Sequence, residues 1–397
     1  MTVARPVEPA LAAIDSQDAT VRAWAVVDRV GARMAPAPGP ISGWTLGVKD
    51  VLDVAGLPTR AGSPTRAEVA PAATDAPAVA LLRAAGAVVL GKTVTTEFAT
   101  MDPAGTANPA APGHTPGGSS SGSAAAVAAG MADLAIGTQT AGSLCRPAAY
   151  CGVAAFKPTF GRVATTGMVP LASSFDTIGL MARDVAHLAV ALQCWGIPDA
   201  DAPTAPVIGV PMPDCHPDLD AAGAWAVAQA SARLVSLGVR TVPVRLPFDT
   251  PHVVALHRRV MAAEAFAAHG SLQADKRVGA RFRELLGEGA VLGVAEVTDA
   301  RSQLHELGRR CWAGFAGLHG LLLPPAPGPA PVGLGSTGPA HYQIPWTAFG
   351  GPLAALPCGH TQARLPLGIM LAAPPGDDAS LLGLARALER ALGVAAV

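Results

Sequence analysis

The chain has few of the features that mark metal-binding or nucleic-acid-binding proteins. Its six cysteines include no Cys-x-x-Cys spacing, so we expect reduced, buried thiols instead of zinc or redox motifs. Ten scattered histidines form no His-Glu-x-x-His motif. Charged residues are 14% of the chain and the net charge is −1, which excludes a strong electrostatic bias toward nucleic acid. We therefore expect no metal, no cofactor and no nucleic-acid partner.

Long apolar runs are missing as well. Although 50% of the 397 residues are hydrophobic, no uninterrupted run is long enough to span a bilayer, so no membrane partner is expected. Residues 7–18 show no basic region before an apolar one, so we expect no signal peptide and predict a cytoplasmic protein. The length and the apolar content are sufficient for a large core.

Lysine is scarce, because the 28 Lys+Arg residues include only Lys49, Lys92, Lys157 and Lys276. An arginine-biased chain is expected to keep a lysine where an amine must lose its proton near neutral pH. Lys49 lies in residues 45–51, where alternating and β-branched apolar residues predict a strand. Burial there would lower its pKa. The alternative is a lysine whose amine reaches solvent at the end of an extended side chain, or one that forms a salt bridge, for example with Asp50.

A Gly/Ser-rich stretch covers residues 117–147. It places Ser119 and Ser143, which are 143 − 119 = 24 residues apart, in glycine-flanked turns on either side of an Ala/Val-rich helix. Serine and glycine bury little apolar area, and glycine loses backbone entropy on folding. Such residues suit a place where the backbone approaches a ligand closely. The alternative is a pair of surface turns flanking a helix.

These segments resemble the amidase signature family. The resemblance is carried by Gly-Val-Lys-Asp at 47–50, Thr-Pro-Gly-Gly-Ser-Ser at 115–120, Ala-Gly-Ser at 141–143, and later segments up to 366–368 in the family's order. It extends from about residue 40 to the C-terminus. It implies an α/β fold with a mixed, mostly parallel central sheet covered by helices on both faces. The alternation of predicted helices (79–85, 123–129) with strands (87–90, 134–138) also favours a layered α/β fold.

By this resemblance, Lys49, Ser119 and Ser143 would form a Ser–cis-Ser–Lys triad. Ser143 would attack a carbonyl carbon to give an acyl-enzyme, and Ser119, preceded by a cis peptide bond, would relay the proton to neutral Lys49. Gly118 would lie at the substrate. The implied reaction is hydrolysis of the amide C–N bond of a small molecule. The implied oxyanion hole consists of the backbone N–H groups of Thr140, Ala141, Gly142 and Ser143.

The stretch departs from the family pattern Gly-Thr-Asp-Thr-Gly-Gly-Ser. Gln139 stands at the aspartate position, and the arginine that commonly follows the nucleophile by two residues is Arg146, three residues on. Malonamidase-like members carry this glutamine and this later arginine, and they hydrolyse small amides that bear a carboxylate. Because a guanidinium binds a carboxylate in bidentate fashion, we expect Arg146 to bind such a group. The alternative is that Arg146 braces the loop against a carbonyl or a distant acid.

Residues 86–93 also fit the P-loop pattern G-x-x-x-x-G-K-[ST]. A P-loop follows a strand and leads into a helix, with its middle residues in an open loop. Here residues 87–90 are themselves the predicted strand and a helix precedes them, so nucleotide binding is not expected.

We predict a single amidase domain over residues 1–397. Its parts would be an N-terminal helix (about 8–31) and linker in 1–40, a catalytic core in 41–194, a variable helical cap region in 195–320, and the C-terminal part of the core in 321–397. The helical pattern of residues 250–318 predicts the cap itself. Further predicted elements are strands at 207–210, 239–244 and 321–323, and a helix at 219–237.

Several functions remain open. The same triad would also cleave carbamates, esters or aryl amides. An A-type subunit of a glutamine amidotransferase, which passes ammonia to a partner, carries the same motifs. A non-catalytic binding protein on an amidase scaffold is the alternative from another class. The sequence also leaves a homodimer open.

Overall fold

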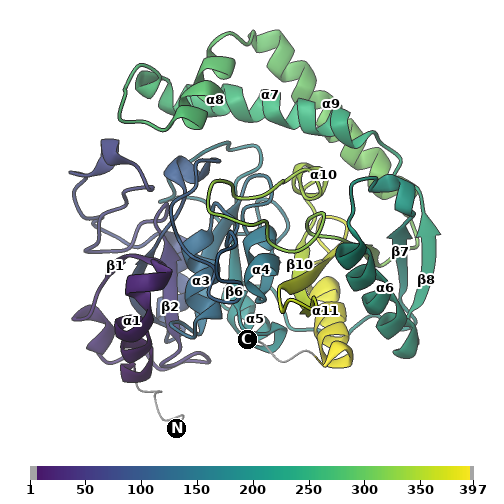
Figure 1. Cartoon of the computed structure of the whole chain (residues 1–397), viewed down its shortest axis with the longest axis horizontal. Coiled ribbons are helices and arrows are strands. Elements are labelled where there is room, and N and C mark those ends of the chain that lie inside the picture. Colours follow the sequence, from purple (N-terminus) through teal and green to yellow (C-terminus); the bar gives the residue numbers. More distant parts are fainter. Residues whose placement is uncertain (1–6, 394–397) are drawn as a thin grey trace.

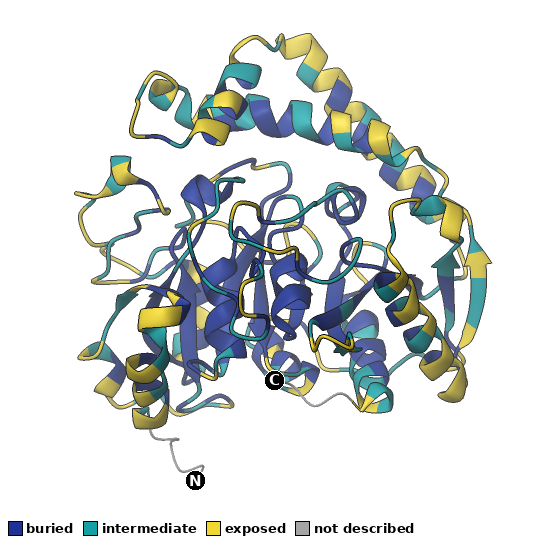
Figure 2. Ribbon diagram, in the orientation of Figure 1, coloured by how far each residue is buried: buried dark blue, intermediate teal, exposed yellow. Residues whose placement is uncertain are grey.

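A single large sheet runs through the molecule in the computed structural model, which describes residues 7–393. Its eleven strands lie in the order β1-β3-β2-β4-β6-β5-β10-β11-β9-β7-β8, and helices flank them (Figure 1). The predicted α/β class with a mixed sheet is confirmed. Figure 2 shows that buried residues concentrate in the strands and the adjacent helices, whereas the outer side of the upper helices is exposed.

The strands are β1 Trp24–Val27, β2 Thr45–Lys49, β3 Val88–Thr93, β4 Leu134–Gln139, β5 Ala154–Lys157, β6 Thr177–Ala182, β7 Val207–Pro211, β8 Arg240–Val244, β9 Gly320–Leu323, β10 Leu353–His360 and β11 Pro366–Ala372. The α-helices are α1 Glu8–Val21, α2 Pro77–Ala84, α3 Ser121–Ala128, α4 Cys145–Cys151, α5 Val185–Gln193, α6 Ala221–Ser236, α7 Thr250–His269, α8 Ala280–Ala290, α9 Val294–Gly314, α10 Ile344–Ala348 and α11 Asp378–Leu392. Short 3-10 helices are η1 Gly31–Arg33, η2 Pro64–Arg66, η3 Glu97–Ala99, η4 Pro213–Cys215 and η5 Gly270–Leu272.

Parallel pairing is less common than we predicted. Of the ten neighbouring strand pairs, four are parallel (β2 with β3 and β4, β7 with β8 and β9) and the other six are antiparallel. The description of the sheet as mostly parallel was therefore wrong. The predicted strands did not include β5, β6, β10 or β11, which take part in five of the six antiparallel pairs. Only residues 361–365 separate β10 from β11, and so short a link permits only antiparallel pairing.

The N-terminal helix is shorter than the predicted 8–31. Helix α1 ends at Val21, where Arg22 takes a left-handed conformation (φ 55°), and Trp24–Val27 continues as edge strand β1 paired with β3. The apolar residues that we interpreted as the end of a helix are used for pairing with the sheet. Tertiary contacts of this kind override local propensity.

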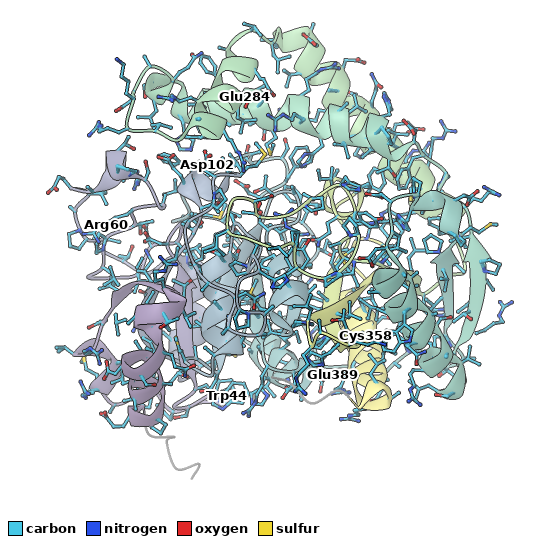
Figure 3. All side chains as sticks on the ribbon, viewed as in Figure 1. Trp44, Arg60, Asp102, Glu284, Cys358 and Glu389 are labelled. Atoms are coloured by element: carbon cyan, nitrogen blue, oxygen red, sulfur yellow. The ribbon has the colours of Figure 1, made fainter. Side chains whose placement is uncertain are left out.

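Helices α7, α8 and α9 arch over one edge of the sheet (Figure 1). They correspond to the predicted helical pattern of residues 250–318. These helices form hydrogen bonds with the segments below them. For example, the carboxylate of Asp102, which is labelled in Figure 3, accepts a hydrogen bond from Phe282 N in α8 at 3.2 Å. Residues 195–320 also include β7, α6 and β8, which extend the central sheet. The division of the chain into core and cap stays a prediction.

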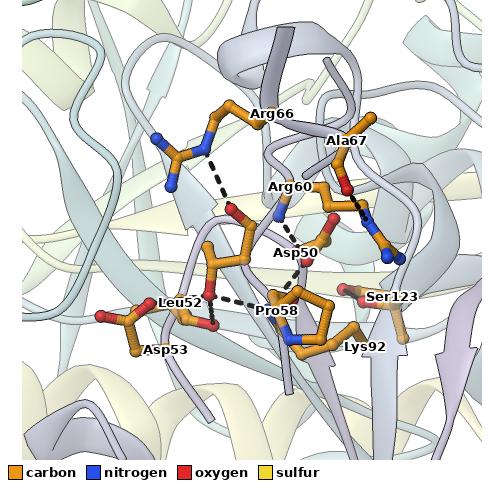
Figure 4. A network of polar contacts seen from close by, with 11 residues as sticks. Asp50, Leu52, Asp53, Pro58, Arg60, Arg66, Ala67, Lys92 and Ser123 are labelled. Atoms are coloured by element: carbon orange, nitrogen blue, oxygen red, sulfur yellow. Dashed lines mark hydrogen bonds and ion pairs between the residues drawn. The ribbon is translucent and has the colours of Figure 1, made fainter. Parts of the chain in front are cut away.

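A buried ion pair anchors the chain just after β2. Lys92 Nζ donates to Asp50 Oδ1 at 2.8 Å, and also to Thr59 Oγ1 and to the Pro58 carbonyl oxygen (Figure 4). Asp50 is thus paired with Lys92, which excludes the alternative salt bridge to Lys49. These contacts also account for the lysine of the P-loop pattern. Lys92 lies inside β3, and its side chain has no exposed surface.

Because a buried charge without its partner is strongly destabilising, Lys92→Met is expected to lower the free energy of unfolding by about 3–5 kcal/mol. Urea unfolding followed by circular dichroism measures this loss. The double variant Lys92→Met/Asp50→Asn, which removes both charges of this pair, should lose less than the sum of the two single changes. A loss below about 1 kcal/mol in Lys92→Met would contradict the assignment.

Candidate active site

Lys49 ends β2 at the edge of the sheet beneath the arching helices, and its side chain is fully buried. Its Nζ donates to Ser119 Oγ and to Thr138 Oγ1, both at 2.7 Å. Burial lowers the pKa of Lys49 to about 7, and the nearby Asp176 carboxylate opposes that shift. A large fraction of the amine is therefore neutral near pH 7 and can accept a proton from Ser119.

Ser119 lies in the turn before α3, and its peptide bond to Gly118 is cis, as the resemblance implies. The next residue joins this turn to the loop that carries Ser143, because Ser120 N donates to the Ser143 carbonyl oxygen at 3.2 Å. No hydrogen bond joins the hydroxyls of Ser119 and Ser143 among residues 7–393. Catalytic hydrogen bonds are often long without substrate and shorten when it binds.

Residues 140–143 form the loop between β4 and α4. All four of its carbonyl oxygens accept hydrogen bonds from outside the loop. Holding every carbonyl restricts rotation of the peptide planes. The donors, in order from residue 140 to residue 143, are His257 Nε2 (2.8 Å), Thr347 Oγ1 (2.6 Å), Arg146 N (3.2 Å) and Ser120 N (3.2 Å).

The four N–H groups of this loop differ from its carbonyl oxygens in their hydrogen bonding. None of them donates a hydrogen bond to any residue in the part of the chain that the structure describes. Thr140, Gly142 and Ser143 are buried, and buried N–H groups without a partner are rare in folded proteins. A row of free backbone donors next to a serine is the arrangement that stabilises a developing oxyanion.

Asp176 is a site residue to which we assigned no role. Its carboxylate accepts hydrogen bonds from Thr140 Oγ1 (2.6 Å), Leu171 N (2.8 Å) and Ala172 N (3.0 Å). Burial raises the pKa of Asp176 to about 6, while these hydrogen bonds and Lys49 oppose the rise. Its motif at 176–179 contributed to the resemblance, but its contact with residue 140 becomes visible only in the fold.

Gln139, which departs from the family pattern, forms three hydrogen bonds through its side chain. Its Oε1 accepts from Leu144 N and Cys145 N, both at 3.0 Å, and its Nε2 donates to Thr347 Oγ1 at 3.0 Å. An aspartate can accept these hydrogen bonds but cannot donate one. Neither Thr347 nor His257 was predicted, since each lies more than a hundred positions from residues 140–143 in the sequence.

A cavity of about 280 Å³ opens at this loop. Thr140, Ala141 and Ser143 form one wall, and several of the other lining residues are apolar. The lining carries two guanidiniums, Arg146 and Arg258, and no carboxylate among the described residues. Arg258 is already paired with Glu288 at 2.8 Å. The apolar lining residues include Met101, Leu171, Met261, Leu285 and Ile344.

Arg146 forms the bracing contact with a carbonyl that we gave as the alternative, and the binding of a substrate carboxylate stays a prediction. Its Nη2 donates to the Gly118 carbonyl oxygen at 2.7 Å, which braces the turn before Ser119. It also lines the cavity, and its buried Nε has no hydrogen-bond partner among residues 7–393. Burial lowers the pKa of Arg146 to about 10, so the guanidinium stays charged at neutral pH. Gly118 itself is not among the lining residues.

Neither a metal centre nor a membrane span is present in the described part of the chain. Within residues 7–393, no group of three or more His, Cys, Asp or Glu side chains is placed to hold a metal ion. None of the helices in that range is long and apolar enough to cross a membrane.

Comparisons with known proteins give a consistent result. Residues 7–309 match the family described as Amidase. The chain is 33% identical to the A-type subunit of glutamyl-tRNA(Gln) amidotransferase from Synechococcus sp. (strain RCC307), over 98% of this chain and 92% of that protein. A crystal structure of an amidase superposes with a TM-score of 0.87 at 30% identity, covering 97% of this chain and 95% of that one. The peptide amidase of Stenotrophomonas maltophilia gives a TM-score of 0.79 at 27% identity, with coverage of 98% and 93%.

The buried amine predicts how the reactivity of Ser143 varies with pH. Since only neutral Lys49 accepts a proton, the rate of acylation by p-nitrophenyl butyrate should rise through pH about 7 and fall about tenfold per unit below it. Asp176→Asn removes the negative charge that raises the Lys49 pKa, so this limb should move to lower pH. A pH–rate profile of kcat/KM tests both points. Asp102→Asn is the control, and an unmoved limb in Asp176→Asn would contradict the coupling.

Proposed function

This chain belongs to the amidase signature family, and from that premise we propose that it hydrolyses the amide C–N bond of a small molecule through an acyl-enzyme on Ser143. The observation that carries the proposal is the 2.7 Å contact between Lys49 Nζ and Ser119 Oγ beside a loop whose four N–H groups are free among the described residues. A neutral base, a relay hydroxyl and oxyanion donors are the three components that serine acylation needs.

The reaction follows from these positions. Ser143 Oγ attacks the amide carbon while its proton passes through the Ser119 hydroxyl to Lys49. The carbonyl oxygen becomes an oxyanion that the N–H groups of residues 140–143 stabilise. Collapse of this intermediate breaks the C–N bond, and Ser119 returns the proton to the leaving amine. Water then attacks the ester by the same route, which releases the acid and restores Ser143.

The cavity suits a particular class of amide. Its apolar walls favour a hydrocarbon or aryl portion, and the Arg146 guanidinium, which has no carboxylate partner among the described residues, disfavours a cationic one. The unpartnered Nε of Arg146 offers a donor to an anionic or carbonyl oxygen of the substrate. A small amide that is neutral or bears a carboxylate therefore fits. Carbamates, esters and aryl amides of the same shape would react by the same steps.

A second candidate is an A-type subunit of a glutamine amidotransferase. It is favoured by the 33% identity, over nearly the full length of both chains, to the corresponding subunit of glutamyl-tRNA(Gln) amidotransferase. The chemistry would be the same up to release of ammonia, which would then pass to a partner. Against it, the α-ammonium group of glutamine would need an acid, and the described cavity lining contains none. A non-catalytic binding protein is the remaining alternative.

A substrate panel separates these functions. The isolated chain should release amine from carboxylated or neutral small amides, and Ser143→Ala should reduce that rate by at least about 1,000-fold without unfolding the protein. The panel should include aryl amides, carbamates and glutamine, with released amine or ammonia measured directly. Preferential release of ammonia from glutamine would favour the amidotransferase function. Failure of Ser143 to react with a fluorophosphonate would favour the binding protein.

Arg146 is expected to set the preference for a carboxylate. Arg146→Met should lower kcat/KM for carboxylated amides relative to neutral ones by about 10- to 100-fold, because a charge-assisted hydrogen bond is worth about 1.5–3 kcal/mol. The matched change Arg258→Met should alter that ratio much less, since Glu288 already neutralises Arg258. An unchanged ratio in Arg146→Met would show that Arg146 only braces the Gly118 carbonyl.

A further inference from the structure

Two side chains from helices far away in the sequence hold the first two carbonyls of the 140–143 loop. His257, on α7, donates from Nε2 to the Thr140 carbonyl oxygen at 2.8 Å. Thr347, on α10, donates from Oγ1 to the Ala141 carbonyl oxygen at 2.6 Å. The next two carbonyls are held by backbone N–H groups instead. Side-chain control is therefore confined to the peptide planes 140–141 and 141–142.

A carbonyl contact of this kind also sets the direction of an N–H. In a planar trans peptide the C=O of one residue and the N–H of the next are antiparallel. Fixing the Thr140 carbonyl therefore aims the N–H of Ala141, and fixing the Ala141 carbonyl aims the N–H of Gly142. Both N–H groups belong to the set that donates no hydrogen bond within residues 7–393. A donor on the carbonyl also polarises the peptide and strengthens its N–H as a donor.

We propose that His257 and Thr347 are positioning residues that aim the N–H groups of Ala141 and Gly142 at the oxyanion of the reacting amide. This inference rests on the proposed function, because it assigns a role within the same site. The inference implies that helix α7, which belongs to the predicted cap, contributes to catalysis. It also gives Gln139 a role in catalysis, since Gln139 Nε2 orients the Thr347 hydroxyl at 3.0 Å.

His257 is held firmly enough to act in this way. It is buried, and its ring stacks on Phe175 with the centroids 4.2 Å apart. Burial lowers the pKa of His257 to about 4, so the ring is neutral at working pH and the Nε2–H tautomer is fixed by the carbonyl that it faces. Since Nε2 is occupied by the Thr140 carbonyl, this nitrogen is not available as a general base.

The rest of α7 is fastened to the same part of the core. The Glu264 carboxylate accepts from Ser174 N at 2.9 Å, and His269 Nε2 donates to the Pro170 carbonyl oxygen at 2.7 Å. Both partners belong to the segment that leads to Asp176, which holds the Thr140 hydroxyl. Several hydrogen bonds therefore fix the position of helix α7 relative to the loop. Of the three α7 side chains that form them, only His257 hydrogen-bonds to residues 140–143.

The test distinguishes a role in orienting the N–H groups of Ala141 and Gly142 from a role in packing alone. Thr347→Val removes the hydroxyl with little change of shape, and Thr347→Ser keeps the hydroxyl. His257→Phe keeps the stacked ring and removes the donor. His269→Phe is the matched control, because it removes a histidine–carbonyl hydrogen bond from the same helix without touching the loop. His257 lines the cavity and Thr347 does not, so the Thr347 variants are the ones that leave the cavity lining unchanged.

With p-nitrophenyl butyrate and the best amide of the panel, Thr347→Val and His257→Phe should each lower kcat by about 10- to 30-fold with KM changed less than about threefold. Binding of a trifluoromethyl ketone, which forms an oxyanion on Ser143, should weaken by a similar factor. Thr347→Ser and His269→Phe should stay within about twofold of the parent protein. Thermal unfolding monitors the fold of each variant.

Other outcomes overturn the inference. If Thr347→Val and His257→Phe keep kcat within about twofold, or change KM alone, the two residues do not aim the donors. If His257→Phe does not fold, the Thr347→Val and Thr347→Ser pair still decides. A parent protein that fails to react with a fluorophosphonate overturns the proposed function and this inference with it, whereas a reactive parent with unaffected variants overturns the inference alone.

Discussion

The site depends on one buried amine. Lys49 is enclosed at the end of β2 with hydroxyl groups as its two hydrogen-bond partners, and that burial makes a neutral lysine available near pH 7. An exposed lysine would be almost fully protonated there and unable to accept a proton. Among the described residues, neither neighbouring carboxylate forms a salt bridge with Lys49. Asp50 is paired with Lys92 instead, and Asp176 raises the Lys49 pKa through its charge while its carboxylate accepts hydrogen bonds from Thr140, Leu171 and Ala172.

The second constraint concerns the backbone next to Ser143. A loop with all of its carbonyls bonded and all of its N–H groups free among the described residues is a preorganised donor site. Its ties come from the turn at Ser120, from α4, from α7 and from α10, which are far apart in the chain. Only a fold that brings these segments together can hold the loop. This explains how helices α7, α8 and α9, which are remote from Ser143 in sequence, contribute to the site through His257.

Much of the core was predictable from short sequence patterns. The strands around Lys49 and Leu134, the helix before Ala87 and the helix after Ser120 all lie where alternation, alanine content and turn residues placed them. Strands β5, β6, β10 and β11 were not predicted, although β3 and β4, which were, are buried to the same extent. Burial therefore does not separate the predicted strands from the missed ones. Strand β1 was interpreted as helix because its pairing with β3 is invisible in a local window.

The sequence by itself determined the family and predicted the candidate reacting groups. A scarce lysine, two serines in glycine-rich turns and their ordered flanking motifs predict a lysine-dependent serine site, because each of these signals lies within a short segment. The tertiary structure alone decided which groups support them. His257, Thr347 and Asp176 meet the 140–143 loop across 117, 206 and 36 positions of sequence, respectively. No local pattern encodes such contacts, since they exist only after the sheet has formed and the helices have packed onto it.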